Sequence, residues 1–141
     1  MANIATTGMS KDMELTSLKL AGFAVESQGA PTAFAADGTL TVNNLRGGLI
    51  SITAAATVTL PSAANIVAGI PNARANDSFD FAVVNTSGAV FTLAAATNNP
   101  TVLGDLRTGL ASATESGSSL WRVRVTTATS GSEAVTVYRL G

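Results

Sequence analysis

Hydrophobic and polar residues alternate most clearly in two runs that lie between residues 57 and 84. In the first run Val58 and Leu60 alternate with threonines, and in the second Phe79, Phe81 and Val83 alternate with smaller or polar residues. A period of two residues is typical of half-buried strands. The pattern therefore predicts two strands that place one face on a core.

A short helix is predicted between these two strands, over residues 63–68. Ser62 is a good N-cap, and Gly69 and Pro71 end the apolar run that follows it. Isolated helices of fewer than about 12 residues are marginal in water. We therefore expect Ile66 and its neighbours to hold this helix in place by packing onto the edge of a sheet.

From residue 39 onward, turn residues recur at short spacing, and β-prone runs rich in Val, Thr and Phe lie between them. About eight such runs predict an all-β antiparallel sandwich or barrel, and among these we expect a jelly roll with the short helix as a cap. The predicted strands are 39–42, 49–53, 57–60, 79–84, 90–93, 101–103, 120–127 and 134–140.

One face of each strand supplies the expected core. The predicted core residues are Leu40, Val42, Leu49, Ile52, Val58, Leu60, Ile66, Phe79, Phe81, Val83, Phe91, Leu93, Trp121, Val123, Val125, Val135 and Val137.

Residues 1–38 hold both lysines and show no strong period. We predict an extended N-terminal arm over 1–38 and a β-sandwich domain over 39–141. A helical arm would gather on one face Met13, Leu15, Leu18 and Leu20. An extended strand, which fits slightly better, would use Leu18, Leu20, Phe23 and Val25.

Composition indicates one domain whose surface carries little charge. The chain has 141 residues, of which 46% are hydrophobic and 12% charged, and its net charge is −1. Such a surface suits close contact with other protein, although a plain soluble β-domain remains an alternative. No basic field is present to attract nucleic acid or an anionic membrane.

The chain offers little reactive chemistry, because it has neither histidine nor cysteine. A metal site would need oxygen ligands alone, and turn and cap chemistry explains the nearest candidates, Asn76, Asp77 and Asp80, better than calcium does. Two carboxylates could in principle hydrolyse a glycoside, but the acids are scattered singly. We therefore expect no enzyme activity and no cofactor.

No apolar run approaches the roughly 18 residues that a membrane span needs, and residues 1–8 lack the pattern of a secretory signal. We therefore expect no membrane association and a location in the cytoplasm unless assembly carries the chain elsewhere.

Arg122 and Arg124 are the most suggestive polar residues. If Trp121 and Val123 face the core, both arginines stand on the outer face of one strand, and Arg139 could lie close by on the last strand. One interpretation is a solvated face that protects an edge strand from pairing. The other is that these arginines bind acidic groups of a partner.

The run TLPSAANIVAGIPNARANDSFDFAVVNTSG, followed by FTLAAAT, resembles the small head decoration proteins, or cement proteins, of tailed bacteriophages. The resemblance covers about residues 39 to 141. It implies a jelly-roll-like sandwich that forms a symmetric oligomer, with a homodimer expected and a trimer as the rival. It also implies attachment to the outer surface of a capsid built from an HK97-type major capsid protein, and thus a location on the virion after assembly in the host cytoplasm.

Decoration requires contact surfaces and no active site. The predicted partner interface consists of Arg122, Arg124 and Arg139 together with the arm residues Leu15, Leu18, Leu20 and Phe23. The alternative is a receptor- or glycan-binding domain of a tail fibre or spike, which usually shows exposed aromatic residues on loops. The chain's only tryptophan and tyrosine, Trp121 and Tyr138, both fall in predicted strands, which disfavours that alternative.

Overall fold

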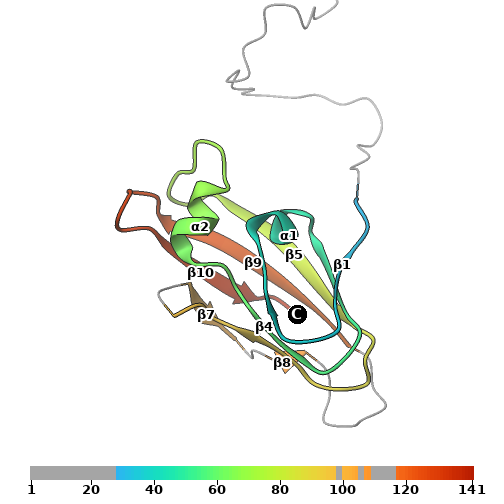
Figure 1. Ribbon diagram of the computed structural model, residues 1–141. Coiled ribbons are helices and arrows are strands. Elements are labelled where there is room, and N and C mark those ends of the chain that lie inside the picture. The colour runs from blue at the N-terminus through green and yellow to red at the C-terminus, as the bar shows by residue number, and fades with distance from the viewer. Residues whose placement is uncertain (1–27, 98–99, 105–106, 109–116) are drawn as a thin grey trace, which may run out of the picture.

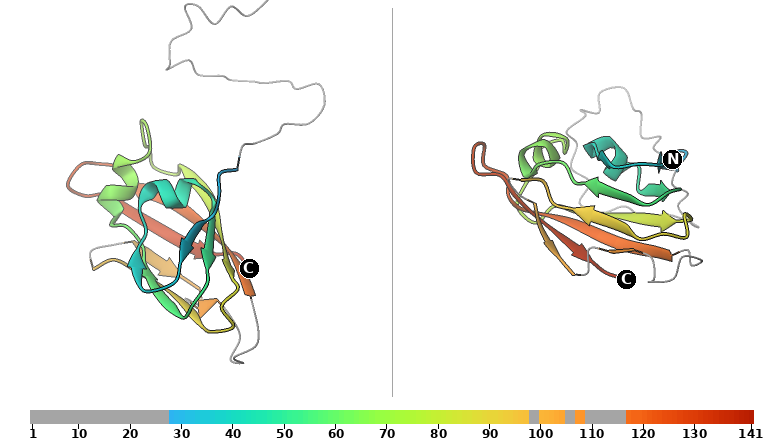
Figure 2. Two further views of the ribbon diagram at one scale, coloured as in Figure 1. Left: turned by 45° about the vertical axis from the view of Figure 1, so that its right-hand side comes forward. Right: turned by 60° about the horizontal axis from the view of Figure 1, so that its bottom comes forward.

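The computed structural model describes residues 28–97, 100–104, 107–108 and 117–141. Within these residues the chain forms ten strands and two short helices. The strands lie in two sheets, and one hydrophobic cluster contains buried residues from both of them. The sheets therefore enclose a single core (Figures 1 and 2).

Sheet A has six strands and sheet B has four. In spatial order, sheet A consists of β1 (Thr32–Phe34), β3 (Leu49–Ile52), β5 (Ser78–Asn85), β9 (Gly117–Thr127), β10 (Ala134–Arg139) and β7 (Thr101–Leu103). Sheet B consists of β2 (Gly38–Thr39), β4 (Ala56–Thr59), β6 (Phe91–Ala94) and β8 (Arg107–Thr108).

The first six strands alternate between the sheets, so that the chain winds around the core. Strands β1, β3 and β5 are parallel neighbours in sheet A, and β2, β4 and β6 are parallel neighbours in sheet B. Each pair of consecutive strands thus stacks on the pair before it. This arrangement resembles three turns of a solenoid, in which each turn contacts mainly its neighbours.

Equivalent residues of successive turns make the same hydrogen bonds. Thr53 follows β3 and donates its backbone N–H to Phe34 O, and Thr86 follows β5 and donates in the same way to Ile52 O, both at 2.9 Å. Both threonine hydroxyls also donate to these carbonyls, at 3.2 Å. The two threonines therefore fix the register at the points where the chain leaves sheet A.

Two helices return the chain from sheet B to sheet A, and both lie at the same end of the molecule (Figures 1 and 2). Helix α1 (Val42–Arg46) begins with a capping box, in which Thr41 and Asn44 each accept a backbone N–H from the other. Helix α2 (Ala63–Ala68) begins at the N-cap Ser62, whose hydroxyl accepts the N–H of Asn65 at 3.3 Å. Each helix packs one or two apolar residues into the core.

The last strands close the fold with antiparallel pairs. β9 runs antiparallel to β5 over the full length of β5, and its other neighbour is β10, also antiparallel. The short strand β7 pairs with β10 in parallel. Because β5 connects the parallel turns to this C-terminal part, residues 78–85 are central to sheet A.

The prediction of a strand-rich fold is confirmed, whereas the prediction of antiparallel pairing is wrong for most of the fold. Five of the eight strand pairings are parallel. A jelly roll is built from antiparallel strands, so these pairings do not correspond to the jelly roll that was predicted. Alternation shows that a strand has one buried face. It does not show whether the neighbouring strands run parallel or antiparallel to it.

Helix α2 occupies the predicted residues, whereas α1 lies where the predicted strand 39–42 ends. Strand β1 lies within residues 1–38, which were predicted as an arm, and pairs with β3. Residues 1–27 lie outside the described part of the chain. The predicted arm residues Leu15, Leu18, Leu20 and Phe23 are among them.

Most of the predicted core residues are buried. Leu49 is an exception, because Ile50 and Ile52 of β3 point inward and Leu49 points outward. Val42 and Phe79 are only partly buried and pack against the core. The prediction omitted four residues of the buried hydrophobic core, which are Leu45, Ile50, Ala56 and Ala63.

Candidate functional site

The outer face of sheet A is the candidate functional site. Along β9, Trp121, Val123 and Val125 are buried, so the residues between them point away from the core. The same alternation in β5 and β10 sends Asp80, Ala82 and Val84 and also Thr136 and Tyr138 to this outer face. The result is a broad, regularly spaced surface formed by strands that are distant in sequence.

Apolar side chains gather on this face. Of the five large apolar residues that are exposed in the described chain, four lie on it: Val84, Leu103, Leu120 and Leu140. Leu120 is opposite Ala82 on one side and hydrogen-bonds through its backbone to Leu140 on the other. Their side chains are 37–49% exposed, and their grouping on one face indicates a surface suited to protein contact.

A row of residues that contains an ion pair borders the apolar residues. Asp80, Arg122 and Tyr138 are direct neighbours across β5, β9 and β10, and Leu103 of β7 continues the row. Arg122 forms two hydrogen bonds with Asp80, from Nε to Oδ1 at 2.7 Å and from Nη2 to Oδ2 at 2.8 Å. This paired, planar geometry orients both side chains on the surface.

The ion pair shifts the pKa of both partners. The hydrogen bond from Arg122 is the main cause that lowers the pKa of the Asp80 carboxyl, and the positive charge of Arg122 adds to it, against a smaller opposing effect of burial. The hydrogen bond to Asp80 raises the pKa of the Arg122 guanidinium. Both groups are therefore charged near neutral pH and form a fixed dipole on the face.

The structure places the three predicted arginines in different environments. Arg124 stands beside Arg122 on the outer face of sheet A, where its guanidinium donates to Asn76 Oδ1 in the loop before β5. Arg139 is instead opposite Trp121 in the strand pairing, and its guanidinium carbon lies 5.8 Å from the centre of the indole ring. Arg122 and Arg124 can therefore contact a partner of this face, whereas Arg139 covers the end of the core.

The sequence prediction of an interface omitted the exposed leucines, although a signal was present. Leu120 alternates with Trp121 in one continuous strand, so both cannot face the same side. Leu140 and Leu103 follow the same rule relative to Val137 and Val102. Several apolar residues at outward positions of neighbouring strands indicate a contact surface when they lie together.

The polar residues that were considered as metal ligands have structural partners. Asp77 accepts the backbone N–H of Arg74 at 2.7 Å and so closes the loop before β5. Asp80 and Asn76 accept hydrogen bonds from arginines, as described above. Among the residues that the structure describes, no group of three or more potential metal ligands occurs.

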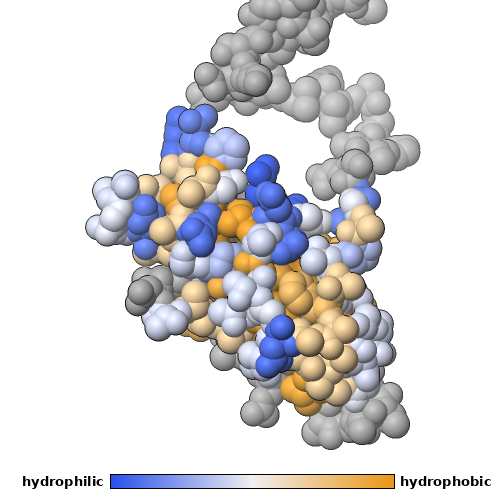
Figure 3. Space-filling view, viewed as in Figure 1, coloured by the Kyte–Doolittle hydropathy of each residue, from blue (hydrophilic) through white to orange (hydrophobic). Residues whose placement is uncertain are grey.

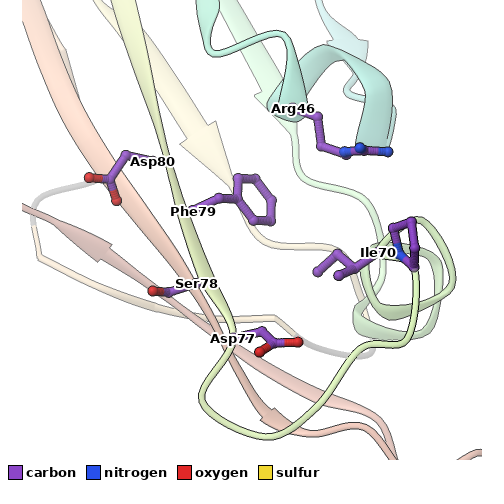
Figure 4. A pocket seen from close by; sticks show the side chains of 7 residues that line it. Arg46, Ile70, Asp77, Ser78, Phe79 and Asp80 are labelled. Carbon is purple, nitrogen blue, oxygen red and sulfur yellow. The ribbon is translucent and has the colours of Figure 1, made fainter. Parts of the chain in front are cut away.

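A second surface feature is a cleft at the helix end, between β5 and the segment that follows α2 (Figure 4). Its volume is about 370 Å³, and its lining includes Phe79, Ile70 and Arg46. Figure 3 shows that hydrophilic and exposed hydrophobic residues lie close together at this end of the molecule.

Within the described ranges, no helix is long and apolar enough to cross a membrane.

Trp121 is fully buried, its ring stacks on Phe81 with 6.3 Å between the ring centres, and its Nε1–H donates to Ser119 Oγ at 2.7 Å. It is therefore not available to stack on a sugar. Tyr138 lies on the outer face of sheet A and is partly buried.

Comparisons with known proteins give no relative of this chain. No protein-family model matches it, no curated protein matches it, and no solved structure matches it.

Proposed function

We propose that this chain is a structural protein that attaches to other protein subunits through the outer face of sheet A. The observation that carries the proposal is the gathering of four of the five exposed large apolar residues on this one face, beside an oriented ion pair. Protein interfaces combine an apolar centre with arginine and aromatic residues in this way. Arg122 and Tyr138 supply these residue types here.

The resemblance of about residues 39 to 141 to head decoration proteins suggests which structural protein this is. In that role the chain is a cement protein on the outside of a tailed-phage capsid and binds an HK97-type major capsid protein. The family's jelly-roll topology is not part of the proposal, because the parallel strand pairs differ from it. Decoration requires an exposed contact surface and an attachment segment, and does not require a catalytic group.

A homodimer is the favoured oligomer. In an interface with two-fold symmetry, the same patch of each subunit meets itself. A patch that carries Asp80 and Arg122 side by side is self-complementary, because each arginine can face the aspartate of the other subunit. A trimer remains the rival, and light scattering of the purified protein distinguishes the two.

The experiment that tests the proposal measures binding to purified phage heads that lack tails. The chain with Leu120→Asp and Leu140→Asp is expected to lose most of its binding, because both changes place charge in the apolar part of the face. Val90→Asp is the matched control, since Val90 is similarly exposed, at 39%, but follows β5 and lies off this face. Equal binding by the double variant, the control and the parent chain would exclude the outer face of sheet A as the attachment surface.

The copy number tests the phage assignment separately. Many copies per head, in a fixed ratio to the major capsid protein, support decoration. A handful of copies at the tail would instead support the tail fibre alternative. If the chain is found neither on the heads nor at the tails, the phage part of the proposal is overturned, and only the proposal of a protein-binding face remains.

The two outward arginines and the arm form a further part of the proposal. Alanine at both Arg122 and Arg124 is expected to weaken head binding most at low salt, because guanidinium groups favour acidic partners. Deletion of residues 1–20 is expected to abolish attachment while the two sheets stay folded. Full binding by the truncated chain would show that the arm is not needed.

A further inference from the structure

Strand β5 extends beyond the start of its neighbour β3. β3 begins at Leu49, which is opposite Ala82, whereas β5 begins at Ser78. On its other side β5 pairs with β9 along its whole length. In the part of the chain that the structure describes, no strand lies beside residues 78–81 on the β3 side.

The backbone groups of Ser78 and Asp80 point toward this open edge. Ala82 donates its N–H to Gly48 O at 2.8 Å on the β3 side, and Thr86 does the same with Ile52 O. Alternate residues of a strand direct their N–H and C=O groups to the same side. Ser78 and Asp80 therefore present two donors and two acceptors to an incoming segment, which is how an extended peptide adds to a sheet.

The cleft described above runs along this edge. Figure 4 shows the Phe79 side chain pointing from β5 into the cleft toward Ile70, with Arg46 of α1 beyond it. Ile70, Pro71 and Phe79 give the cleft an apolar wall. Asp80 and Ser78 point to the other side of β5, so they contribute their backbone to the cleft.

Arg46 gives the cleft a positive charge. Its Nη1 donates to Gly69 O at 3.2 Å, and no carboxylate of a described residue forms an ion pair with it. Asp77 also lines the cleft, but its carboxylate accepts the N–H of Arg74. The cleft therefore fits an extended segment in which an apolar residue is followed by an acidic one.

The N-terminal part of the chain enters the described structure next to this cleft. Gln28 is the first described residue, and its side chain donates to the carbonyl oxygen of Gly47, the residue after Arg46. The sequence before Gln28 reads Phe23, Ala24, Val25, Glu26 and Ser27. It contains the apolar residue followed by an acidic one that the cleft requires.

We propose that residues 23–26 of the same chain bind in this cleft, with Val25 on the apolar wall and Glu26 facing Arg46. One residue separates Glu26 from Gln28, so the two Cα atoms lie within about 7 Å of each other. This short connection favours the same chain over a second copy, because it makes the effective concentration of the segment high. The proposal does not depend on the identity of the partner of the outer face.

Hydrogen exchange in the full chain tests the proposal. The amides of Ser78 and Asp80 are expected to exchange slowly in the parent chain, because the bound segment covers them. Glu26→Arg is expected to speed their exchange by about tenfold or more, because it places two positive charges together. Exchanging the charges in Glu26→Arg with Arg46→Glu is expected to restore slow exchange.

The matched control is Glu14→Arg, which makes the same charge change in the N-terminal region but outside the segment. It is expected to leave the exchange of both amides unchanged. If both amides exchange equally fast in the parent chain and in Glu26→Arg, or if the charge exchange fails to restore protection, the proposal is wrong.

Engineered cysteines identify which copy supplies the segment, because the chain has no cysteine of its own. With Val25→Cys and Ile70→Cys, mild oxidation is expected to give a disulfide within one chain, seen as a monomer of altered mobility on a non-reducing gel. Val25→Cys with Thr57→Cys, which places the second cysteine on the exposed face of sheet B, is the control and should react little. A dimer band from the first pair would overturn the assignment to the same chain.

Discussion

Asp80 and Arg122 are direct neighbours across β5 and β9 and form two parallel hydrogen bonds on the outer face of sheet A. The pair joins the N-terminal, parallel part of the sheet to its C-terminal, antiparallel part. Its members are 42 residues apart in the sequence. The geometry predicts a measurable consequence for the titration of Asp80.

In the folded chain, the pKa of Asp80 is expected to lie below the usual aspartate range, because Arg122 stabilises the charged carboxylate. Carboxyl NMR shifts followed from pH 7 to pH 2 measure this. Arg122→Ala should move the pKa of Asp80 upward, whereas Arg74→Ala should leave it unchanged. An unchanged pKa in Arg122→Ala would show that the ion pair does not persist in solution.

The same shift sets the sign of the pH dependence. Because the pKa of Asp80 is lower in the folded chain than in the unfolded one, the pair stabilises the fold above the pKa of the unfolded chain. This stabilisation is lost as the pH falls through the lowered pKa. Both side chains are substantially exposed, at 49% and 37%, so the effect on the free energy of unfolding is expected to be small.

Phe81 and Trp121 form the centre of the core, with their rings nearly parallel at an angle of 10°. Phe81→Ala is expected to lower the free energy of unfolding by about 3–5 kcal/mol, because it removes a buried ring and leaves a cavity. Leu120→Ala, which changes the outward neighbour of Trp121, should lower it by less than about 1 kcal/mol. Denaturant unfolding of both variants checks the assignment of the two faces, and similar losses in the two variants would contradict it.

The buried indole N–H of Trp121 is satisfied by Ser119, which is itself buried. Ser119→Ala removes this acceptor, and we expect a loss of about 1–3 kcal/mol in the free energy of unfolding, because a buried donor loses its partner. Ser118→Ala is the matched control, since Ser118 is exposed on the same strand. Thermal or denaturant unfolding should separate the two variants, and equal stabilities would mean that water replaces the hydroxyl.

Local features of the fold could be predicted from the sequence because they depend on residues close together in the chain. Helix α2 needs only its N-cap Ser62, a short apolar run and Gly69, and it was predicted at its observed bounds. The inward positions of β9 follow from the alternation around Trp121 and Val123 in the same way. Both features are encoded within about ten residues.

Helix α1 shows how a local signal can be misread. Val42 continues the β-prone run that starts at Thr39, so the run was predicted as a strand. The capping box between Thr41 and Asn44 and the glycines after Arg46 favour a helix start and end instead. Burial of Leu45 in the core then stabilises a helix of only one to two turns.

The parallel stacking could not be predicted, because it depends on which distant strands meet. Ile50 pairs with Thr32 on one side and with Val83 on the other, at very different separations in the sequence. When one face of a sheet is solvated, a strand shows the same apolar alternation whether its neighbours are parallel or antiparallel. The outer face of sheet A is subject to the same limit, since Leu103, Leu120 and Leu140 come together only through the pairing of three strands.

The two helices approach closely where Gly69 ends α2 and Val42 begins α1. A Cβ atom added at Gly69 would meet the side chain of Val42, and the backbone there is in an ordinary right-handed conformation with a φ of −82°. Gly69→Ala is therefore expected to lower the free energy of unfolding by about 1–3 kcal/mol through crowding. Val42→Ala alone should cost less than the loss of a fully buried valine, because Val42 is only partly buried. The double variant Gly69→Ala with Val42→Ala should be more stable than the sum of the two losses predicts, since the smaller side chain makes room for the new methyl group. A double-mutant cycle by denaturant unfolding measures this coupling, and losses that simply add would show that α1 and α2 do not meet at these two residues.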